Sequence, residues 1–396
     1  MKRVLIFLTT GMICIMKPFK LFAYTTKSGF LKRLIIQFTT FLDFIISFIH
    51  GQNEVMEVYQ RVYKGNFIFG HGVMKTDFQS TIDEIKHPSM RTNHFMGIPV
   101  VSGNEVFIVN SPLISLGEPF RTLAREHIDE TIFDEAFYSL TYEDVIEKCA
   151  VPLKEWLESP KPQDIITMRS VSTRMTILLC DDLLISKEDS EKATAAYLKH
   201  FVRLSLFKNY FTLITGLLGT EKYIKKDAFY HLKKLGVSST VIDATLFAAM
   251  FSIGTLFTKC VDYLRKHNID YDSLDLEEKK RFVVEVVRLY PTVTTTHRIL
   301  EAPEEVVVAG RTLQLTEGDE IVYPFVCSNT DEKAFKCPFD IKLDRSEEDY
   351  DKVLSWSKGA HACPARDFSV LVTIAMLDTL NGHTSLKNVD YKGAIL

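Results

Sequence analysis

The sequence has no C-x-x-C pair and no N-x-[ST] sequon among its 396 residues. Its seven cysteines are odd in number and scattered along the chain. This distribution gives no support to a zinc knuckle or a dithiol redox motif, and it favours one special cysteine over a disulfide framework. A reducing compartment, or a membrane that faces one, is the expected environment.

An excess of one sign of charge is also lacking. The 47 basic and 51 acidic residues give a formal net charge of −4. Because there is no general basic field, nucleic acid is not expected as a partner. Hydrophobic residues make up 46% of the chain, enough for a large core. The sequence shows no obvious domain break, so we expect one catalytic domain over residues 51–396, preceded by a basic, apolar segment over residues 1–50.

Apolar runs long enough for a membrane span are absent as well. Val4–Met16 and Ile35–Ile49 are both shorter than the ~20 residues that a spanning helix needs. The first 42 residues contain seven basic residues and no acid. Three interpretations stay open for residues 1–50: an interfacial anchor, a targeting peptide, or the first buried helices. We expect a membrane-associated or organellar protein, with an intracellular soluble protein as the alternative.

Helical periodicity dominates what is present. Residues 53–116 mix short apolar runs with Gly and Pro, which predicts strands and loops, whereas residues 117–290 have a largely helical pattern. The longest apolar stretch, Val241–His267, predicts a helix through the middle of the molecule. Val306–Leu315 predicts two strands joined by a tight turn. The expected fold class is therefore mainly α with small β-sheets.

Two segments near the C-terminal end carry charged and polar residues at fixed spacing. Glu285 and Arg288 are three residues apart, so they share one face of a helix, where a solvated surface salt bridge is the ordinary outcome. The second segment begins with Asn329–Phe335 and continues to Arg345. Neither segment is informative alone.

A third segment, Trp356–Ala365, presents Cys363 in a Gly-bearing loop just before the apolar helix Phe368–Leu380. A thiolate near a helix start gains from the positive end of the helix dipole. Such a position suits an axial thiolate ligand of haem iron. A buried structural cysteine is the alternative.

Taken together, the order and spacing of the three segments resemble the cytochrome P-450 family of haem-thiolate proteins. The family pattern is E-x-x-R, then an N-x-D-x-x-x-F loop that ends in a second Arg, then F-x-x-G-x-R/H-x-C-x-G. The matching residues are Glu285, Arg288, Asn329, Asp331, Phe335, Arg345, Trp356, Gly359, His361, Cys363 and Ala365. The resemblance implies the cytochrome P-450 fold, with heme b (iron protoporphyrin IX) between the long central helix and the cysteine-bearing loop and helix.

The same resemblance implies roles for individual residues. Cys363 would ligate the haem iron, and Glu285, Arg288 and Arg345 would form a buried ion triad that braces the cysteine loop. Removing one member of such a triad leaves buried charge uncompensated, so we expect it to be needed for folding. Four residues are expected at the haem propionates, each with an ordinary surface charge as the alternative: His361, Arg298, Arg121 and Arg125.

The long helix lacks the acidic residue followed by Thr that delivers protons to dioxygen in the monooxygenases of this family. The chain has Phe251 and Ser252 at this position, and the closest carboxylates, Asp243 and Asp262, are two or more turns away. The allene oxide synthase, hydroperoxide lyase and epoxyalcohol synthase branch lacks the pair too. Its long helix reads F-N-x-x-G-G, which resembles Phe251–Thr255 with Ser in place of Asn and Thr in place of the second Gly.

Two further segments resemble that branch, its W-S-N-G and its C-A-G-K-D-F-x-V-L-V. The corresponding stretches here are Trp356-Ser-Lys-Gly and Cys363-Pro-Ala-Arg-Asp-Phe-Ser-Val-Leu-Val. The resemblance implies an enzyme that rearranges or cleaves fatty-acid hydroperoxides, with no need for dioxygen or an obligatory reductase. A reductase-fed monooxygenase is the alternative, and a non-enzymatic haem sensor is a third class. The product stays open between an epoxyalcohol, an allene oxide and aldehydes.

In this interpretation Phe251 lies beside the lipid radical and Ser252 positions the peroxide by a hydrogen bond. Core packing of Phe251 and a bond from Ser252 back to its own helix are the alternatives. The expected ligand is a polyunsaturated fatty-acid hydroperoxide or another apolar small molecule. Residues expected in an apolar channel, or else in the core, are Phe95, Val100, Val101, Phe107 and Val293.

Overall fold

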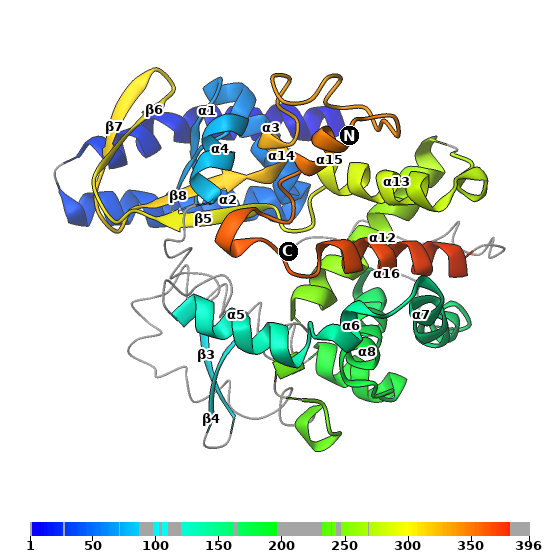
Figure 1. The fold of residues 1–396 in the computed structure, drawn as a ribbon. Coiled ribbons are helices and arrows are strands. Elements are labelled where there is room, and N and C mark those ends of the chain that lie inside the picture. Colours follow the sequence, from blue (N-terminus) through cyan, green and yellow to red (C-terminus); the bar gives the residue numbers. More distant parts are fainter. Residues whose placement is uncertain are drawn as a thin grey trace.

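A computed structural model of the chain describes residues 2–26, 28–70, 72–86, 98–102, 105–109, 120–160, 165–195, 232–238, 240–242, 247–267 and 269–380 (Figure 1). Helices dominate these residues, and short strands pair into small sheets between them. The helices are α1 (Lys2–Thr25), α2 (Gly29–His50), α3 (Gln52–Tyr63), α4 (Phe78–Ile85), α5 (Phe120–Thr131), α6 (Glu135–Tyr138), α7 (Tyr142–Leu157), α8 (Ile165–Asp181), α12 (Phe247–His267), α13 (Leu276–Leu289), α14 (Phe325–Ser328), α15 (Glu347–Asp351) and α16 (Arg366–Thr379), with 3₁₀ turns η3 (Tyr271–Ser273) and η4 (Gly359–His361). The strands are β1 (Phe67–Phe69), β2 (Gly72–Met74), β3 (Ile98–Ser102), β4 (Glu105–Val109), β5 (Thr295–Ile299), β6 (Glu304–Val308), β7 (Arg311–Leu315) and β8 (Glu320–Pro324).

The largest sheet has the strand order β1-β2-β8-β5. Strands β2 and β8 pair in parallel, although they are far apart in sequence, whereas β1–β2 and β5–β8 are antiparallel. Strands β6 and β7 form the predicted hairpin, with Val308 opposite Arg311. Ala309 and Gly310 between them have φ angles of 51° and 75°, as a two-residue turn of this kind requires. The hairpin prediction is confirmed.

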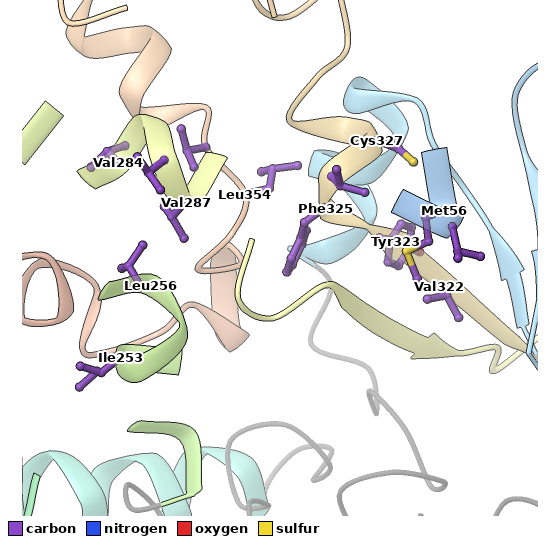
Figure 2. Close-up of a cluster of buried hydrophobic side chains, with 14 of the residues drawn as sticks. Met56, Ile253, Leu256, Val284, Val287, Val322, Tyr323, Phe325, Cys327 and Leu354 are labelled. Carbon is purple, nitrogen blue, oxygen red and sulfur yellow. The ribbon is translucent and has the colours of Figure 1, made fainter. Parts of the chain in front are cut away.

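One hydrophobic core runs from the helices to the sheet. Figure 2 shows some of its side chains, from α12 and α13 on one side to β8 and α3 on the other. The labelled members are Met56, Ile253, Leu256, Val284, Val287, Val322, Tyr323, Phe325, Cys327 and Leu354.

The long helix α12 packs against α8, α13 and α16. It begins at Phe247, and the first part of the predicted stretch is only partly described. At Gly254 helix α12 lies close to α8, because a Cβ atom there would be 2.9 Å from the Ser172 hydroxyl oxygen. A glycine at this position therefore permits the close approach of the two helices.

The first fifty residues contribute to the same core as the rest of the chain. Helices α1 and α2 pack against each other and against α3, and α1 also contacts β1 and β7 (Figure 1). Ile13, Met16, Leu21 and Ile46 are buried members of the main hydrophobic cluster. Of the three interpretations of this segment, packing as the first helices is therefore present in the structure. No helix within the described residues is long and apolar enough to cross a membrane.

A buried charged pair ties the two N-terminal helices to α3 and the sheet. Lys20 of α1 donates to the Asp43 carboxylate of α2, to the Tyr59 hydroxyl at 3.0 Å and to the Ile68 carbonyl at 3.0 Å. Asp43 also accepts from the Tyr59 hydroxyl and, at 2.7 Å, from the Gly70 amide. Every charge is thus compensated, which is the condition under which a buried ion pair is tolerated.

Replacing Asp43 by Ala should leave the buried Lys20 ammonium without its counter-ion. We expect the free energy of unfolding to fall by about 3–5 kcal/mol, measured by urea denaturation. Glu57→Ala is the control, because it breaks the exposed i,i+4 pair between Glu57 and Arg61 and should cost less than about 1 kcal/mol. Equal losses for the two variants would contradict the assigned role of Lys20 and Asp43.

Candidate active site

Helix α13 positions the first two residues of the predicted triad. A capping box fixes where this helix starts: the Asp275 carboxylate accepts the Glu278 amide at 2.8 Å, and the Glu278 carboxylate accepts the Asp275 amide at 3.1 Å. Glu285 and Arg288 then lie on one face, both with no exposed side-chain surface. Their isolated spacing pointed to a surface pair, but the structure buries both.

The structure brings Arg345 to the same carboxylate. Arg288 donates to the two Glu285 oxygens at 2.7 and 3.0 Å, and Arg345 donates to Oε2 at 2.9 Å. The two guanidinium groups also donate to backbone carbonyl groups of residues 329–340. Phe335 lies beneath both cations, 5.2 and 5.8 Å from the guanidinium carbons. The triad thus holds the loop between α14 and α15 against α13.

Asn329 connects the triad to the segment that leads into the cysteine loop. Its amide nitrogen donates to the Arg288 carbonyl at 3.2 Å and to the Ser355 hydroxyl at 2.9 Å. Its carbonyl oxygen accepts the Leu354 amide at 2.9 Å. Because Asn329 is fully buried, these bonds fix the segment around residues 354–355 relative to α13.

The cysteine loop closes on itself immediately afterwards. The Cys363 amide donates to the Trp356 carbonyl at 2.8 Å, and the Trp356 indole donates to the Ser369 hydroxyl of α16 at 3.1 Å. Gly359 has a φ angle of 65°, and a Cβ atom there would lie 2.7 Å from the Cα atom of Lys86. Both the backbone conformation and the close approach of Lys86 therefore call for glycine.

Cys363 combines an accessible side chain with surroundings that disfavour its charge. The residue is exposed, yet the protein atoms packed around the thiol raise its pKa above the usual value. The Ala365 amide and the positive charge of Arg125 act in the opposite direction and lower the pKa. A metal cation bound to the sulfur would lower the pKa further, because a metal-bound thiol is deprotonated.

Other described cysteines differ from Cys363. Cys149, Cys260 and Cys327 are buried in the main core, and burial raises the pKa of the Cys149 thiol to about 12. These three are inert structural cysteines, the fate that a cysteine in a core usually has.

Of the four residues predicted at the propionates, two lie at the cysteine loop. His361 is in η4, two residues before Cys363. Arg125 of α5 donates to the Ala362 carbonyl at 3.2 Å and to both Asp129 oxygens at 2.8 Å. Arg121 lies in the first turn of α5, but its side chain is outside the described residues. The propionate contacts themselves stay predictions.

Arg298 of β5 is held by partners that the sequence did not point to. Its guanidinium donates to the Glu84 and Glu304 carboxylates at 3.1 and 2.9 Å, and to the Tyr323 hydroxyl at 3.1 Å. Lys75 donates to the same two carboxylates. The two acids compete with a propionate for Arg298.

The helix α12 carries the second set of predicted residues. Phe251 is partly buried and packs against the cluster that also receives Ala365 and Phe368, so packing occupies at least part of its ring. Ser252 is half-buried, and its hydroxyl group makes no hydrogen bond to any residue that the structure describes. The only carboxylate of α12, Asp262, pairs with Lys266 and lies nearly three turns from Ser252.

Arg169 is a residue that the sequence reasoning missed. It belongs to α8, and its guanidinium carbon lies 4.6 Å from the ring centroid of Phe251. No pattern in the sequence connects residue 169 with residue 251, because the contact depends on how α8 crosses α12.

The predicted channel residues are only partly placed. Phe95 is outside the described residues. Val100 and Val101 are in β3 and Phe107 in β4, without described side chains, and Val293 is exposed. The channel wall therefore stays a prediction.

Comparisons with known proteins give a consistent answer at the level of the fold. No protein-family model matches the chain, and no curated protein matches it. Among solved structures, the haem domain of a cytochrome P-450 from Tepidiphilus thermophilus has a TM-score of 0.58 at 14% identity, covering 85% of this chain and 88% of that one. A thermophilic cytochrome P-450 from Sulfolobus tokodaii has a TM-score of 0.56 at 16% identity, covering 81% and 89%.

P-450BioI, solved with acyl carrier protein carrying hexadec-9Z-enoic acid, has a TM-score of 0.57 at 15% identity, covering 84% of this chain and 92% of that one. The chain therefore has the cytochrome P-450 fold, and the expected mainly α architecture with small sheets is confirmed.

Replacing Glu285 by Gln should leave two buried guanidinium groups without a counter-charge. We expect the free energy of unfolding to fall by about 3–5 kcal/mol, measured by urea denaturation. The matched control is Glu277→Gln on the same helix, which removes an exposed pair with Lys280 and should cost less than about 1 kcal/mol. A Glu285 variant as stable as this control would show that the triad does not brace the fold.

Proposed function

We propose that the protein is a haem-thiolate enzyme that rearranges or cleaves fatty-acid hydroperoxides, of the epoxyalcohol synthase, allene oxide synthase or hydroperoxide lyase type. The fold supports the general class of haem-thiolate proteins. The narrower reaction is supported by α12, where no carboxylate lies near Ser252. That absence within the described helix is the observation that carries the proposal.

The described residues fit heme b. Cys363 offers an accessible thiol just before the start of α16, with the Ala365 amide and the Arg125 charge both favouring the thiolate. His361 and Arg125 lie at the same loop and are suited to the propionates. When bound, the haem would supply the redox chemistry that splits the peroxide bond.

The hydroperoxide explains why the enzyme can work without a proton relay. A lipid hydroperoxide already contains both oxygen atoms, and its conversion to an epoxyalcohol is an isomerisation in which all atoms are retained. Formation of an allene oxide releases one water, and cleavage to aldehydes needs no external electrons either. The reaction uses neither dioxygen nor electrons from a reductase. A carboxylate that protonates bound dioxygen is therefore not needed.

The chain's own residues would bind and orient the substrate. The Ser252 hydroxyl has no partner among the described residues and is free to donate to the peroxide. The Phe251 ring provides apolar surface beside it. A fatty chain is compatible with this fold, since P-450BioI was solved with a hexadecenoyl chain. The protein would thus contribute orientation and the exclusion of water.

Purified ferric protein should consume a polyunsaturated fatty-acid hydroperoxide without any reductant, seen as loss of conjugated-diene absorbance. Ser252→Ala should slow this reaction about tenfold, the effect of one hydrogen bond to the reacting group, and Ser252→Asn should retain it. Thr258→Ala is the matched control, because the Thr258 hydroxyl is already bonded to its own helix at Thr255.

Turnover that requires NADPH, a reductase and dioxygen would instead identify a monooxygenase and overturn the proposal. Cys363→Ala should abolish the carbon monoxide Soret signature of a haem-thiolate protein. Persistence of that signature would show that another residue is the axial ligand. Mass spectrometry of the products identifies which of the three product classes forms.

A further inference from the structure

Helix α8 buries the guanidinium group of Arg169, which has no anionic partner among the described residues. The Arg169 side chain is 4% exposed, and its Nε atom makes no hydrogen bond to any residue that the structure describes. None of the carboxylates in the described part of the chain forms an ion pair with it. The guanidinium carbon of Arg169 lies 4.6 Å from the centroid of the Phe251 ring.

A second arginine on the same helix shows the usual arrangement. Arg174 is also 4% exposed, but its guanidinium pairs with Glu155 at 2.7 Å and donates to the Ile185 carbonyl at 3.0 Å. The chain therefore provides a counter-ion for one buried arginine of α8, and the described residues provide none for the other.

The state of Arg169 has an energetic consequence. Burial lowers the pKa of Arg169 to about 10, which still leaves the side chain protonated at neutral pH. Burying a charge without a partner is costly, and the ring face of Phe251 compensates only part of that cost. An anion from outside the chain that binds Arg169 would compensate the remaining free-energy cost of burying the charge.

We propose that Arg169 binds the carboxylate of the substrate, so that the enzyme selects long-chain free acids over their esters. The inference rests on the proposed function, because it places the acid end of that substrate beside Phe251. The planar guanidinium fork matches a carboxylate in geometry. A chain anchored at Arg169 would run past the Phe251 ring, and its peroxide, many carbons from the acid, would lie farther along toward Ser252, whose side chain leaves α12 about 100° from that of Phe251.

The test measures binding of an unreactive ligand to the haem-loaded protein. Palmitate and methyl palmitate are titrated by calorimetry against the wild type, Arg169→Leu and the matched control Arg174→Leu. We expect the wild type to bind the acid on the order of 30-fold more tightly than the ester. Arg169→Leu should bind both equally, with the affinity for the ester unchanged.

Thermal unfolding separates this role from a structural one. Without ligand, Arg169→Leu should unfold at a higher temperature than the wild type, because an uncompensated buried charge is removed, whereas Arg174→Leu should unfold at a lower temperature. Arg169→Lys retains the cation and should keep part of the preference for the acid. A wild type that does not distinguish acid from ester, or an Arg169→Leu variant that still does, would overturn the inference. Since palmitate has no peroxide, failure of hydroperoxide turnover would not affect this result.

A different observation supports a second proposal. Helices α1 and α2 expose a series of large hydrophobic side chains, each between 37% and 78% exposed. They recur every three or four residues, so they form one stripe on each helix. We call them the N-terminal apolar stripes: Leu8, Met12, Ile15, Phe19 and Phe22 on α1, and Phe30, Leu34, Phe38 and Phe41 on α2.

The exposed charge described on helices α1 and α2 is basic. No charged residue is exposed on α1 from Leu8 to Thr25, and Arg33 is exposed beside Leu34 on α2. Lys20 is buried with Asp43, and Lys32 pairs with Asp319, so neither presents a free charge. Apolar stripes with an exposed cation at their edge match the interface of a bilayer that contains anionic lipid.

We infer that the N-terminal apolar stripes dock on the surface of an anionic membrane, with both helices lying in its plane. The opposite faces of α1 and α2 belong to the hydrophobic core, so the helices can contact a bilayer without leaving the fold. Membrane docking would bring the enzyme to the bilayer, in which apolar hydroperoxides dissolve.

Vesicle flotation provides the test, with phosphatidylcholine alone and with added phosphatidylglycerol. The wild type should float with the anionic vesicles and less with the neutral ones, and high salt should weaken its binding. A triple variant with Ile15→Ser, Phe19→Ser and Phe38→Ser should bind at least about 100-fold more weakly. The matched control replaces three exposed hydrophobic residues elsewhere, Leu123→Ser, Leu184→Ser and Phe339→Ser, and should bind as the wild type does.

Equal loss in the two triple variants would overturn this inference. So would a wild type that ignores vesicles but forms a dimer that the first variant dissolves, since the stripes would then contact a second copy.

Discussion

The carboxylate of Glu285 organises the half of the molecule that presents the cysteine. Two guanidinium groups and the Lys342 amide converge on its two oxygens, and the Glu285 side chain has no exposed surface. The two guanidinium groups also donate to the carbonyl groups of Asn329, Lys336, Cys337, Pro338 and Asp340. These bonds fix the course of a loop that has little regular structure.

This arrangement is transmitted to the sulfur by covalent and hydrogen-bonded steps. Asn329 joins α13 to Leu354 and Ser355, and Trp356 follows directly and accepts the amide of Cys363. The position of the thiol therefore depends on Glu285, although the two residues are 78 positions apart in the sequence. The cysteine thus lies on a loop whose position is fixed by buried hydrogen bonds.

The resemblance to the cytochrome P-450 pattern indicated which residues meet at Glu285, because that pattern consists of short local segments. The Glu-x-x-Arg helix, the Asn-containing loop and the cysteine loop each consist of a few consecutive residues, so their patterns survive without any knowledge of the fold. Arg169 could not be found in this way, since its relation to Phe251 arises only where α8 crosses α12. Arg298 was predicted beside a propionate from its place after the helix. The two acids that it contacts, Glu84 in α4 and Glu304 in β6, are brought to it by the fold, and no local sequence pattern predicts these contacts.

The accessibility of the thiols divides the cysteines in a way that has a practical use. The buried Cys149, Cys260 and Cys327 are shielded from alkylating reagents, Cys180 is partly buried, and Cys14, Cys337 and Cys363 are open to such reagents. Coordination to iron would withdraw Cys363 from that reactive group and leave the other two. The number of groups that iodoacetamide adds to the folded chain therefore reports the fraction of a preparation that contains bound iron.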